Sequence, residues 1–390
     1  MTVSPPPAPA GSGGGQPLTV VIVDDSAVQR RFARAAIEAD ANLTVVGEAR
    51  NGRDAIAMVD RLRPNAVLMD LHLPVMNGIE AIERIMATRP TPILVYSSFV
   101  DGDDRDNAAA ALAAGAVDVM EKPGDAGRLD EFAESLRRRI RVAGRVKVIT
   151  HPRGRLGGPA ATMSTRRLGG PARRADAEPA THRAPATKAL DGLGRRDVRL
   201  IAIGASTGGP HALSMVLAEL PADLEAAVVV VQHMADGFIE GLAAWLDTLC
   251  ALPVAVGANG RRLVAGTVTV APSGLNLIVH DQLRVTTHEP PKTQYHVPGI
   301  DATLTSVAEC MGAAAVGVLL TGMGRDGALG LKKMRDRGSF TIAQDEETSA
   351  VYGMPAAAMA LGAADLELPL SEVGPALRQL TAAPVIEVST

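Results

Sequence analysis

The serine best suited to chemistry in this chain stands in a glycine-rich turn. Residues 204–209 read Gly-Ala-Ser-Thr-Gly-Gly, with Ser206 in third place, and they follow the largely apolar run Val198–Ile203. A strand that passes through Gly-x-Ser-x-Gly into a helix exposes the serine hydroxyl at a sharp turn, where glycines let backbone N–H groups approach it. A loop of similar composition can also hold a phosphate at a helix N-terminus. The segment alone leaves both a nucleophile and a phosphate site open.

A histidine and an aspartate follow two other apolar runs in the same half of the chain. His233 comes two residues after the run Ala226–Val231, and Asp326 lies in a glycine-rich segment that follows the run Ala315–Leu320. These runs have the continuous apolar character of buried parallel strands, whose carboxyl ends share one edge of a sheet. We therefore expect Ser206, His233 and Asp326 to meet at that edge.

Together these three side chains match the needs of acyl transfer. Ser206 would attack, His233 would take and return the proton, and Asp326 would orient the imidazole and stabilise its charged form. Backbone N–H groups near Thr207 and Met323 would bind the oxyanion. The rival is a nucleotide site, but the chain has no Gly-x-x-x-x-Gly-Lys-Ser/Thr segment and the serine loop does not read Gly-x-Gly-x-x-Gly. The pattern therefore favours a serine hydrolase that needs no cofactor.

A second group of candidate functional side chains lies in the first part of the chain. Asp24 and Asp25, Asp70, Ser97 and Lys122 each follow or end a strand-like run. If these strands are parallel, three carboxylates, a hydroxyl and an ammonium converge at one edge. Three acidic groups repel one another unless a divalent cation neutralises them, and an all-oxygen ligand set suits Mg²⁺. The cation and Lys122 would also stabilise phosphoryl oxygens during transfer to Asp70.

Short apolar runs alternate with helical stretches such as 27–39 and 107–114 in this first part. Five such units predict a doubly wound α/β domain with a five-stranded parallel sheet. The expected strands are residues 18–23, 44–49, 66–69, 92–96 and 117–120.

The α/β alternation returns after Val198 and predicts a second, mainly parallel sheet. Between Pro253 and Pro291 the punctuation by Gly, Pro and Asn indicates an antiparallel annex on that sheet. Helices are expected at residues 210–219, 238–249, 301–311 and 326–335. The expected strands are residues 198–203, 227–231, 267–271, 275–280, 283–287, 315–320 and 340–343.

Composition sets the domain boundaries and excludes several classes of function. The chain has 390 residues, and we expect a disordered tail at 1–17, a first domain at 18–143, a flexible linker at 144–197 and a second domain at 198–385. The net charge of −4 and the aromatic content of 2% argue against nucleic-acid binding. The two cysteines lie far apart, and there is no signal peptide or long apolar span, so we expect a cytoplasmic monomer with no membrane insertion.

The first group of residues resembles response-regulator receiver domains. The similarity rests on Val-Asp-Asp-Ser at 23–26, Met-Asp-Leu-His-Leu-Pro-Val-Met-Asn-Gly at 69–78 and Glu-Lys-Pro at 121–123, and it spans residues 18 to about 143. The resemblance implies that Asp70 accepts the phosphoryl group from a chemotaxis histidine kinase. It also implies that Asp24, Asp25 and Asp70 bind Mg²⁺, and that Ser97 and Lys122 are switch residues.

The second group resembles the chemotaxis protein-glutamate methylesterases. The matching segments are 204–210, 232–234, 321–327, 343–345 and 352–355. The resemblance implies that the chain demethylates glutamyl methyl esters on the cytoplasmic helices of methylated chemoreceptors and deamidates receptor glutamines. It also implies a triad of Ser206, His233 and Asp326, with Thr207 and Met323 near the oxyanion.

Two segments depart from the pattern of that family. Asn276 stands where the family usually has histidine in Ala-Pro-Gly-Gly-x-His-Met, and Val297 stands where it usually has arginine in His-Arg-Pro-Ser-Val-Asp. Both segments border the cleft in the family, so substrate choice is the property most exposed to these changes. The alternatives are a non-catalytic, phosphorylation-dependent adaptor that binds receptor helices, and an esterase that serves a receptor pathway other than chemotaxis. A DNA-binding regulator is disfavoured, because the second half has no helix-turn-helix pattern or basic face.

Overall fold

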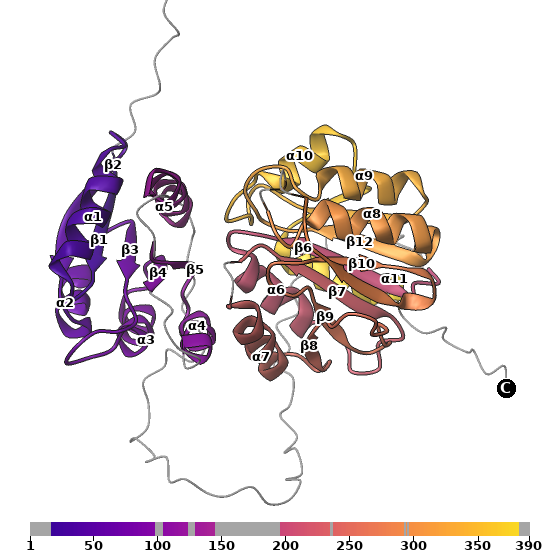
Figure 1. Ribbon diagram of the computed structural model, residues 1–390, viewed down its shortest axis with the longest axis horizontal. Coiled ribbons are helices and arrows are strands. Elements are labelled where there is room, and N and C mark those ends of the chain that lie inside the picture. The colour runs from indigo at the N-terminus through magenta and orange to yellow at the C-terminus, as the bar shows by residue number, and fades with distance from the viewer. Residues whose placement is uncertain are drawn as a thin grey trace, which may run out of the picture.

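The computed structural model has two α/β halves, each built on one main sheet, and they lie side by side (Figure 1). The described residues are 17–97, 104–123, 129–144, 196–234, 237–291, 294 and 296–381. The predicted N-terminal tail and linker fall almost wholly outside them. No helix within the described ranges is long and apolar enough to cross a membrane.

The first sheet has five parallel strands in the order β2-β1-β3-β4-β5. The strand β1 lies next to β3, so the residues that follow these two strands are neighbours at the carboxyl edge. Side chains accept backbone hydrogen bonds at the N-termini of three helices, where Ser26, Asn51 and Asn77 cap α1, α2 and α3. The strands are β1 (Leu18–Val23), β2 (Leu43–Ala49), β3 (Ala66–Met69), β4 (Ile93–Ser97) and β5 (Asp118–Glu121). The helices are α1 (Ala27–Glu38), α2 (Gly52–Leu62), α3 (Gly78–Thr88), α4 (Asp104–Ala113) and α5 (Leu129–Ala143).

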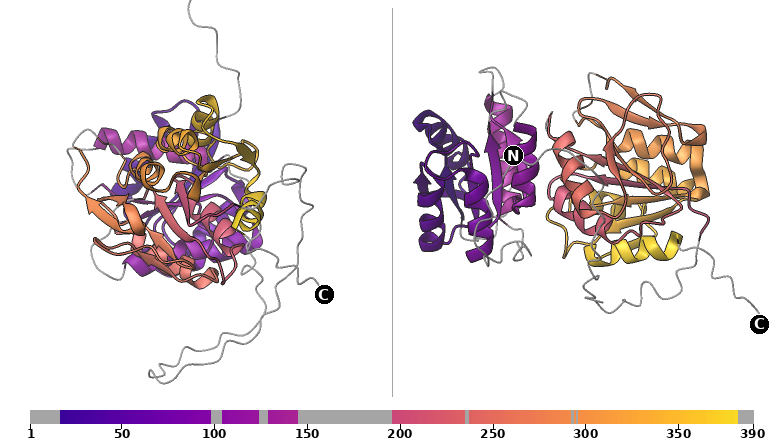
Figure 2. Two further views of the ribbon diagram at one scale, coloured as in Figure 1. Left: turned by 90° about the vertical axis from the view of Figure 1, so that its right-hand side faces the viewer. Right: turned by 90° about the horizontal axis from the view of Figure 1, so that it is seen from below.

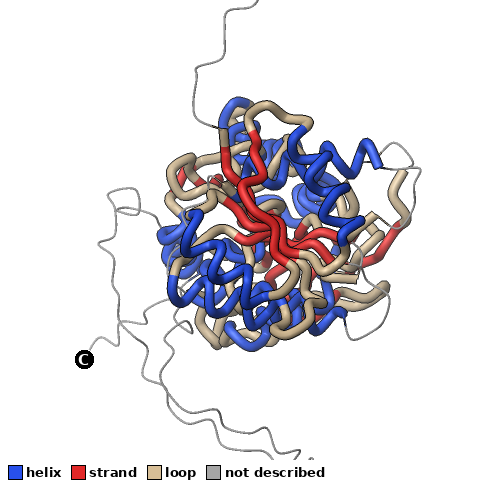
Figure 3. The backbone as a smooth tube through the Cα atoms, turned by 90° about the vertical axis from the view of Figure 1, so that its left-hand side faces the viewer, coloured by secondary structure: helices blue, strands red, loops and turns tan. Residues whose placement is uncertain are grey.

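Helices cover both faces of this sheet, as the doubly wound prediction requires. Alternate residues of β1 point to opposite faces, so Val20 and Ile22 pack with α1 and α5, whereas Val21 and Val23 pack with α2 and α3. Figure 3 looks onto this half and shows the red strands between blue helices. The predicted five-stranded α/β fold is confirmed.

The second sheet has seven strands in the order β14-β13-β12-β6-β7-β9-β8, and each neighbouring pair is parallel. The helices α8, α9 and α10 cover one face, and α6, α7 and α11 cover the other (Figure 1). The strands are β6 (Leu200–Ala205), β7 (Ala227–Gln232), β8 (Val254–Val256), β9 (Val268–Val270), β12 (Ala315–Leu319), β13 (Phe340–Gln344) and β14 (Leu366–Leu368). The helices are α6 (Gly209–Ala218), α7 (Ile239–Leu249), α8 (Ile300–Met311), α9 (Ala328–Asp336), α10 (Met354–Ala360) and α11 (Leu370–Thr381).

The predicted antiparallel annex exists but is smaller than expected. The strands β10 (Asn276–Val279) and β11 (Val285–His288) form an antiparallel hairpin around a short 3₁₀ helix at Asp281–Leu283. In contrast, β8 and β9 fall inside the segment assigned to the annex, yet they extend the parallel sheet beside β7. The turn residues in this segment therefore connect parallel strands of the main sheet as well as the two strands of the hairpin.

The two halves are in contact through helices. The helix α4 of the first half packs against α7 of the second, and the view from below places the magenta helices of the first half toward the second half (Figure 2). A single buried apolar cluster includes Met86 and Leu112 from the first half and Leu242 and Leu246 from α7. This contact is apolar, so it excludes water in the manner of a domain core.

The helix α8 packs on the second sheet beside the edge that carries the predicted site. A substitution of Leu304 tests how much this packing contributes to stability. This side chain is fully buried in the cluster between the sheet and α8. We expect Leu304→Ala to reduce the free energy of unfolding by about 2–5 kcal/mol, because it leaves a cavity. Thermal denaturation measures the change. The control is Leu329→Ala, since Leu329 is 60% exposed on α9 and its loss should cost no more than about 0.5 kcal/mol. Equal effects of the two changes would contradict this account of the core.

Candidate active site and carboxylate site

Ser206 occupies a strand–turn–helix corner at the carboxyl end of β6. Its backbone N–H donates to the Thr321 carbonyl at 3.0 Å, and its own carbonyl accepts from the Gly209 N–H at 2.7 Å. Gly208 has a φ of +77°, a conformation in which a side chain would be strained, and α6 begins directly after it. The serine is 8% exposed. The local geometry is the one expected from Gly-x-Ser-x-Gly.

The structure brings His233 and Asp326 to the same edge. The His233 N–H donates to the carbonyl of Ala205 at 3.0 Å, so the histidine lies beside the residue that precedes Ser206. His233 Nε2 and Asp326 Oδ2 are 2.8 Å apart. The same carboxylate accepts the backbone N–H groups of Ile300 and Asp301 at the start of α8, both at 2.9 Å. The aspartate is therefore fixed from two sides.

Electrostatics keep Asp326 ionised. Burial alone would raise the pKa of its carboxyl, but the hydrogen bond and charge of His233 and the N–H groups of Asp301 and Ile300 together lower the pKa below its usual value. An ionised carboxylate only accepts hydrogen bonds, so His233 Nε2 carries the proton in the neutral imidazole. The other nitrogen, Nδ1, is then the proton acceptor. It is buried and has no hydrogen-bond partner.

Two backbone N–H groups near Ser206 are available to a developing negative charge. Within the described part of the chain, neither the Thr207 nor the Met323 N–H donates a hydrogen bond. Met323 follows Gly322, where a Cβ would lie only 2.8 Å from the Cβ of Ser206, so this loop lies against the serine. The structure thus places both predicted oxyanion residues beside the candidate nucleophile. No hydrogen bond joins the Ser206 hydroxyl to His233 among the described residues, and such bonds often form only when substrate binds.

Two buried glutamines that sequence reasoning missed hold the loops of the site together. The Gln232 amide nitrogen donates to the carbonyls of Ser206 and His233, both at 2.8 Å. Gln344, at the end of β13, accepts the Thr321 N–H at 2.8 Å and donates to the Thr348 carbonyl. The signal in the sequence was that each glutamine ends a largely apolar strand, where a fully buried amide needs partners.

A second histidine was also missed. The ring of His296 stacks on that of His233, with centroids 4.6 Å apart and an interplanar angle of 12°. Asn276, one of the departures from the family pattern, supports the same region: its Oδ1 accepts the Gly299 N–H at 2.7 Å, and it exchanges two hydrogen bonds with the Gln294 amide. Asn276 is therefore committed to an internal network and does not face the serine as a free polar group.

The carboxylate site lies at the carboxyl edge of the first sheet, as predicted. Carboxylate oxygens of Asp24, Asp25 and Asp70 lie within 4.8 Å of one another. Lys122 Nζ forms ion pairs of 2.7 Å with both Asp24 and Asp70, and the Ser97 hydroxyl donates to Asp70 Oδ1 at 3.3 Å. Burial, opposed by Lys122 and assisted by the charge of Asp70, raises the pKa of Asp24. The site thus holds more negative charge than one ammonium neutralises.

Arg30 is a buried support of this site that the sequence did not reveal. It is 5% exposed, and its Nη1 donates to the backbone carbonyls of Asp24 and Asp25 at 2.8 and 3.0 Å. Its Nε pairs with Glu48 at 3.1 Å. The guanidinium thus fixes the backbone of the two aspartates. Nothing in the sequence distinguishes Arg30 from the solvated arginines beside it in α1.

Charges of the first half influence the electrostatics of the serine site. The positive charges of Arg138 and Arg139, in α5 of the first half, contribute to lowering the pKa of His296 in the second. The ribbon in Figure 1 shows α5 and α4 on the side of the first half that faces the second. In this arrangement the first half lies close to the residues around Ser206.

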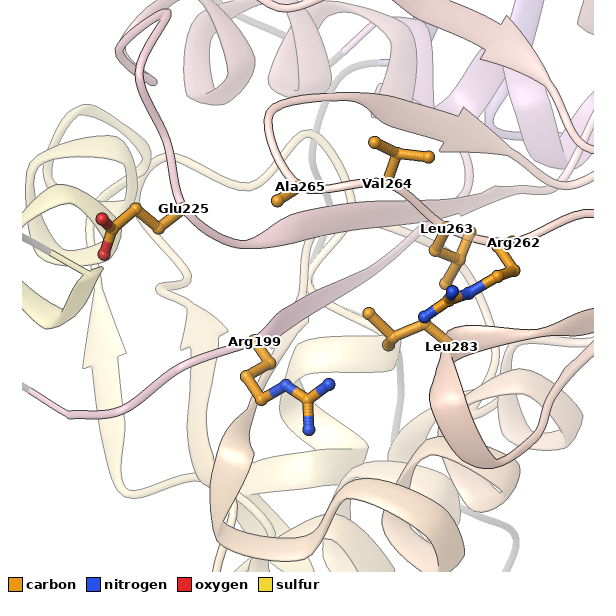
Figure 4. Close-up of a pocket in the computed structure, with 7 residues that line it drawn as sticks. All are labelled: Arg199, Glu225, Arg262, Leu263, Val264, Ala265 and Leu283. Atoms are coloured by element: carbon orange, nitrogen blue, oxygen red, sulfur yellow. The ribbon is translucent and has the colours of Figure 1, made fainter.

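A pocket elsewhere in the second half is unrelated to this edge. It has a volume of about 390 Å³ and is lined by Leu263, Leu283 and the side chains of Arg199, Glu225 and Arg262 (Figure 4). Arg199 and Glu225 precede β6 and β7, so the pocket lies at the amino ends of the strands. Ser206 and His233 follow the other ends of the same strands.

Comparison with known proteins gives the chain's relatives. The family model described as CheB methylesterase matches residues 201–377, and that of the response regulator receiver domain matches residues 20–134. The protein-glutamate methylesterase/protein-glutamine glutaminase 2 of Anaeromyxobacter dehalogenans is 41% identical over 95% of this chain and 99% of its own. The enzyme of the same name, numbered 3, from Paramagnetospirillum magneticum is 41% identical over 94% and 97%.

Two solved structures cover the halves separately. The CheB methylesterase catalytic domain of Thermotoga maritima is 36% identical, with a TM-score of 0.45, and covers 46% of this chain and 97% of its own. The response regulator domain of Thermotoga maritima CheB is 32% identical, with a TM-score of 0.32, and covers 34% and 100%.

The raised pKa of Asp24 predicts how its charge affects folding. A carboxyl whose folded-state pKa lies above its unfolded value contributes stability at low pH and loses it as the pH rises through the folded pKa. We therefore expect Asp24→Asn to stabilise the first half at pH 7 in the presence of EDTA. Hydrogen exchange of the β1 and β3 amides measures this stability.

Asp25 provides the matched control for this experiment. It belongs to the same carboxylate cluster but is exposed, so Asp25→Asn should change stability by no more than about 0.5 kcal/mol. Faster exchange in Asp24→Asn than in the unmodified protein would show that Asp24 is net stabilised by Lys122 and would contradict the prediction.

Proposed function

Because the chain belongs to the family of protein-glutamate methylesterases/protein-glutamine glutaminases, we propose that it demethylates glutamyl methyl esters of chemoreceptor cytoplasmic domains under the control of its receiver domain. Deamidation of receptor glutamines is part of the proposal, because an ester and a primary amide present the same acyl carbon to a nucleophile. The observation that carries it is the hydrogen-bonded pair of His233 and Asp326 beside Ser206, at the end of β6. Activity on those receptor domains also implies a cytoplasmic location.

Each candidate residue has a defined part in the proposed reaction. Ser206 Oγ attacks the ester carbonyl and its proton passes to His233 Nδ1, while the carbonyl oxygen becomes an oxyanion held by the Thr207 and Met323 N–H groups. The tetrahedral intermediate expels the methoxy group, which takes the proton from His233 and leaves as methanol. Water then attacks the acyl-serine, again through His233, and releases glutamate and free Ser206. Asp326 stabilises the imidazolium in both halves of the reaction.

The receiver domain is the proposed control element, with Asp70 as phosphoacceptor and a chemotaxis histidine kinase as phosphodonor. The three carboxylates of Asp24, Asp25 and Asp70 are the oxygen donors that Mg²⁺ prefers. Burial, with a contribution from the charge of Asp70, raises the pKa of Asp24, and a bound cation would stabilise its charged form. Bound Mg²⁺ would neutralise phosphoryl oxygens during transfer. Lys122 is placed to pair with the new phosphoryl group, and the Ser97 hydroxyl can turn toward it.

Control of access follows from the contact between the halves. Ser206 is largely buried, and α5 of the receiver domain lies near His296. Phosphorylation of Asp70 would reorganise the side of the receiver that faces the hydrolase and shift the population toward an open arrangement. Both the apolar packing of α4 on α7 and the position of α5 would change in that transition.

The nucleophile is tested by Ser206→Ala. We expect methanol release from a methylated receptor fragment to fall on the order of 10⁴-fold or more, because the alanine side chain cannot form the acyl intermediate. The matched control is Ser214→Ala in α6. Its hydroxyl donates to the nearby carbonyl of His211, and its loss should leave the rate unchanged. Full methanol release by Ser206→Ala would refute the assignment. A fluorophosphonate label that requires both Ser206 and His233 distinguishes the enzyme from a receptor-binding adaptor.

Control by the receiver is tested by Asp70→Asn. Trp245 is the only tryptophan of the chain and lies in α7, the helix that contacts α4. Acetyl phosphate with Mg²⁺ should stimulate methanol release and change the Trp245 emission of the unmodified protein, because opening alters the surroundings of α7. Asp70→Asn should lose both responses, whereas Asp60→Asn, at an exposed position in α2, should keep them. Stimulation of Asp70→Asn would locate the phosphoacceptor elsewhere.

A further inference from the structure

His233, the base of the proposed hydrolase, lies next to a second histidine that has no part in the proposed reaction. The His296 ring lies face to face with the His233 ring, at 4.6 Å between centroids and 12° between planes. The His233 side chain is 8% exposed, so the stack covers a ring that is otherwise buried. His296 itself remains partly exposed to solvent at the surface of the site.

The segment that carries His296 is fixed by side-chain hydrogen bonds. The Gln294 amide nitrogen donates to the His296 carbonyl at 2.6 Å. The same amide exchanges hydrogen bonds of 2.8 and 2.9 Å with Asn276 at the start of β10, and Asn276 Oδ1 also accepts the Gly299 N–H. Both sides of His296 are thus anchored to the hairpin, so the stacked ring is held in place by its own framework.

Asp326 and His296 restrict different motions of the His233 ring: Asp326 fixes the position of Nε2, and His296 fixes the ring plane. The carboxylate holds Nε2 at 2.8 Å, which leaves rotation about that contact open, and the stacked ring fixes the plane. We propose that His296 is a positioning residue for the base: it fixes the plane of the His233 imidazole and stabilises the imidazolium that forms when His233 takes the serine proton. The inference rests on the proposed hydrolase function and names a residue that this function did not include.

The stabilisation requires a neutral His296. The face of a neutral aromatic ring attracts a cation, whereas a charged ring would repel it. Desolvation and the charge of His233 lower the pKa of His296, Asp326 acts in the opposite direction, and Arg138 and Arg139 of α5 lower it further. The lowered pKa of His296 favours its neutral form, which is the form that can stabilise a cationic ring stacked on it. In acid, a protonated His296 would oppose that ionisation.

The test compares two substitutions of His296 that distinguish the effect of a stacked aromatic ring from the effect of side-chain volume. His296→Phe keeps a flat ring that cannot titrate, and His296→Leu keeps apolar volume without a ring. The full chain is activated with acetyl phosphate and Mg²⁺, and the rate of fluorophosphonate labelling of Ser206 is measured from pH 5 to 9. We expect His296→Leu to slow labelling about tenfold, and His296→Phe to stay near the unmodified rate at neutral pH. His296→Phe should also retain more of its rate in acid than the unmodified protein does.

Controls and a second measurement separate the possible failures. His288→Phe and His288→Leu, at an exposed histidine of β11, should change nothing, and thermal denaturation should show all variants folded. Equal rates for the unmodified protein and both His296 variants, or equal losses in both variants, would overturn the inference. If the unmodified protein does not label at all, the hydrolase function fails instead. In that case NMR of labelled histidine tests the proposal without the reaction. A lower pKa of His233 in His296→Leu than in His296→Phe supports stabilisation of the imidazolium by the stacked ring, and equal values refute it.

Discussion

The parallel pairing of β6 with β7 on one side and β12 on the other is the constraint on which the serine site depends. It aligns three strand ends, so that His233 continues from β7 beside Ala205, and the loop after β12 passes against Ser206. Ser206 and His233 are positioned by backbone hydrogen bonds, whereas Asp326 is held through its carboxylate, which accepts the N–H groups at the start of α8. Close approach of the loops favours glycine at 322, because a Cβ there would lie 2.3 Å from Met354 Sδ and 2.8 Å from the Cβ of Ser206. The Gln232 amide reinforces the arrangement by bonding to the carbonyls of Ser206 and His233 together.

The receiver site uses the same sheet geometry for a different electrostatic purpose. Strand ends β1 and β3 bring Asp24 and Asp70 together, and the single ammonium of Lys122 between them leaves excess negative charge. In the serine site one ionised carboxylate faces one imidazole, so the charge of Asp326 becomes balanced when His233 accepts a proton. The first arrangement favours a cation and a phosphoryl group. The second favours a proton transfer between neutral partners with a carboxylate to stabilise the product.

The sequence predicted those parts of the molecule that depend on strand order alone. Continuous apolar runs identified β6, β7 and β12, and the residues that follow them lie at one edge of the sheet, where His233 and Asp326 are hydrogen-bonded. The sequence did not predict β8 and β14, since three residues are too few to show a period, and β8 also lies among turn residues. The equally short β9 was predicted because the apolar residues around it extend the pattern. His296 and Arg30 could not be assigned from sequence, since their roles depend on which surface a distant segment packs against. The residue roles themselves stay predictions.

The stack between His233 and His296 also has consequences for how the halves communicate. Ser206, His233 and Asp326 are held by strand ends and by the start of α8, so they have little freedom to respond to the receiver. His296 is held by side-chain amides, and it is the residue of the site whose pKa the arginines of α5 influence. Separation of the halves would remove two positive charges from the surroundings of the base and its neighbour. If opening exposes Ser206 as proposed, it therefore also raises the pKa of His296, so the charge state of the ring stacked on His233 responds to the position of the receiver domain.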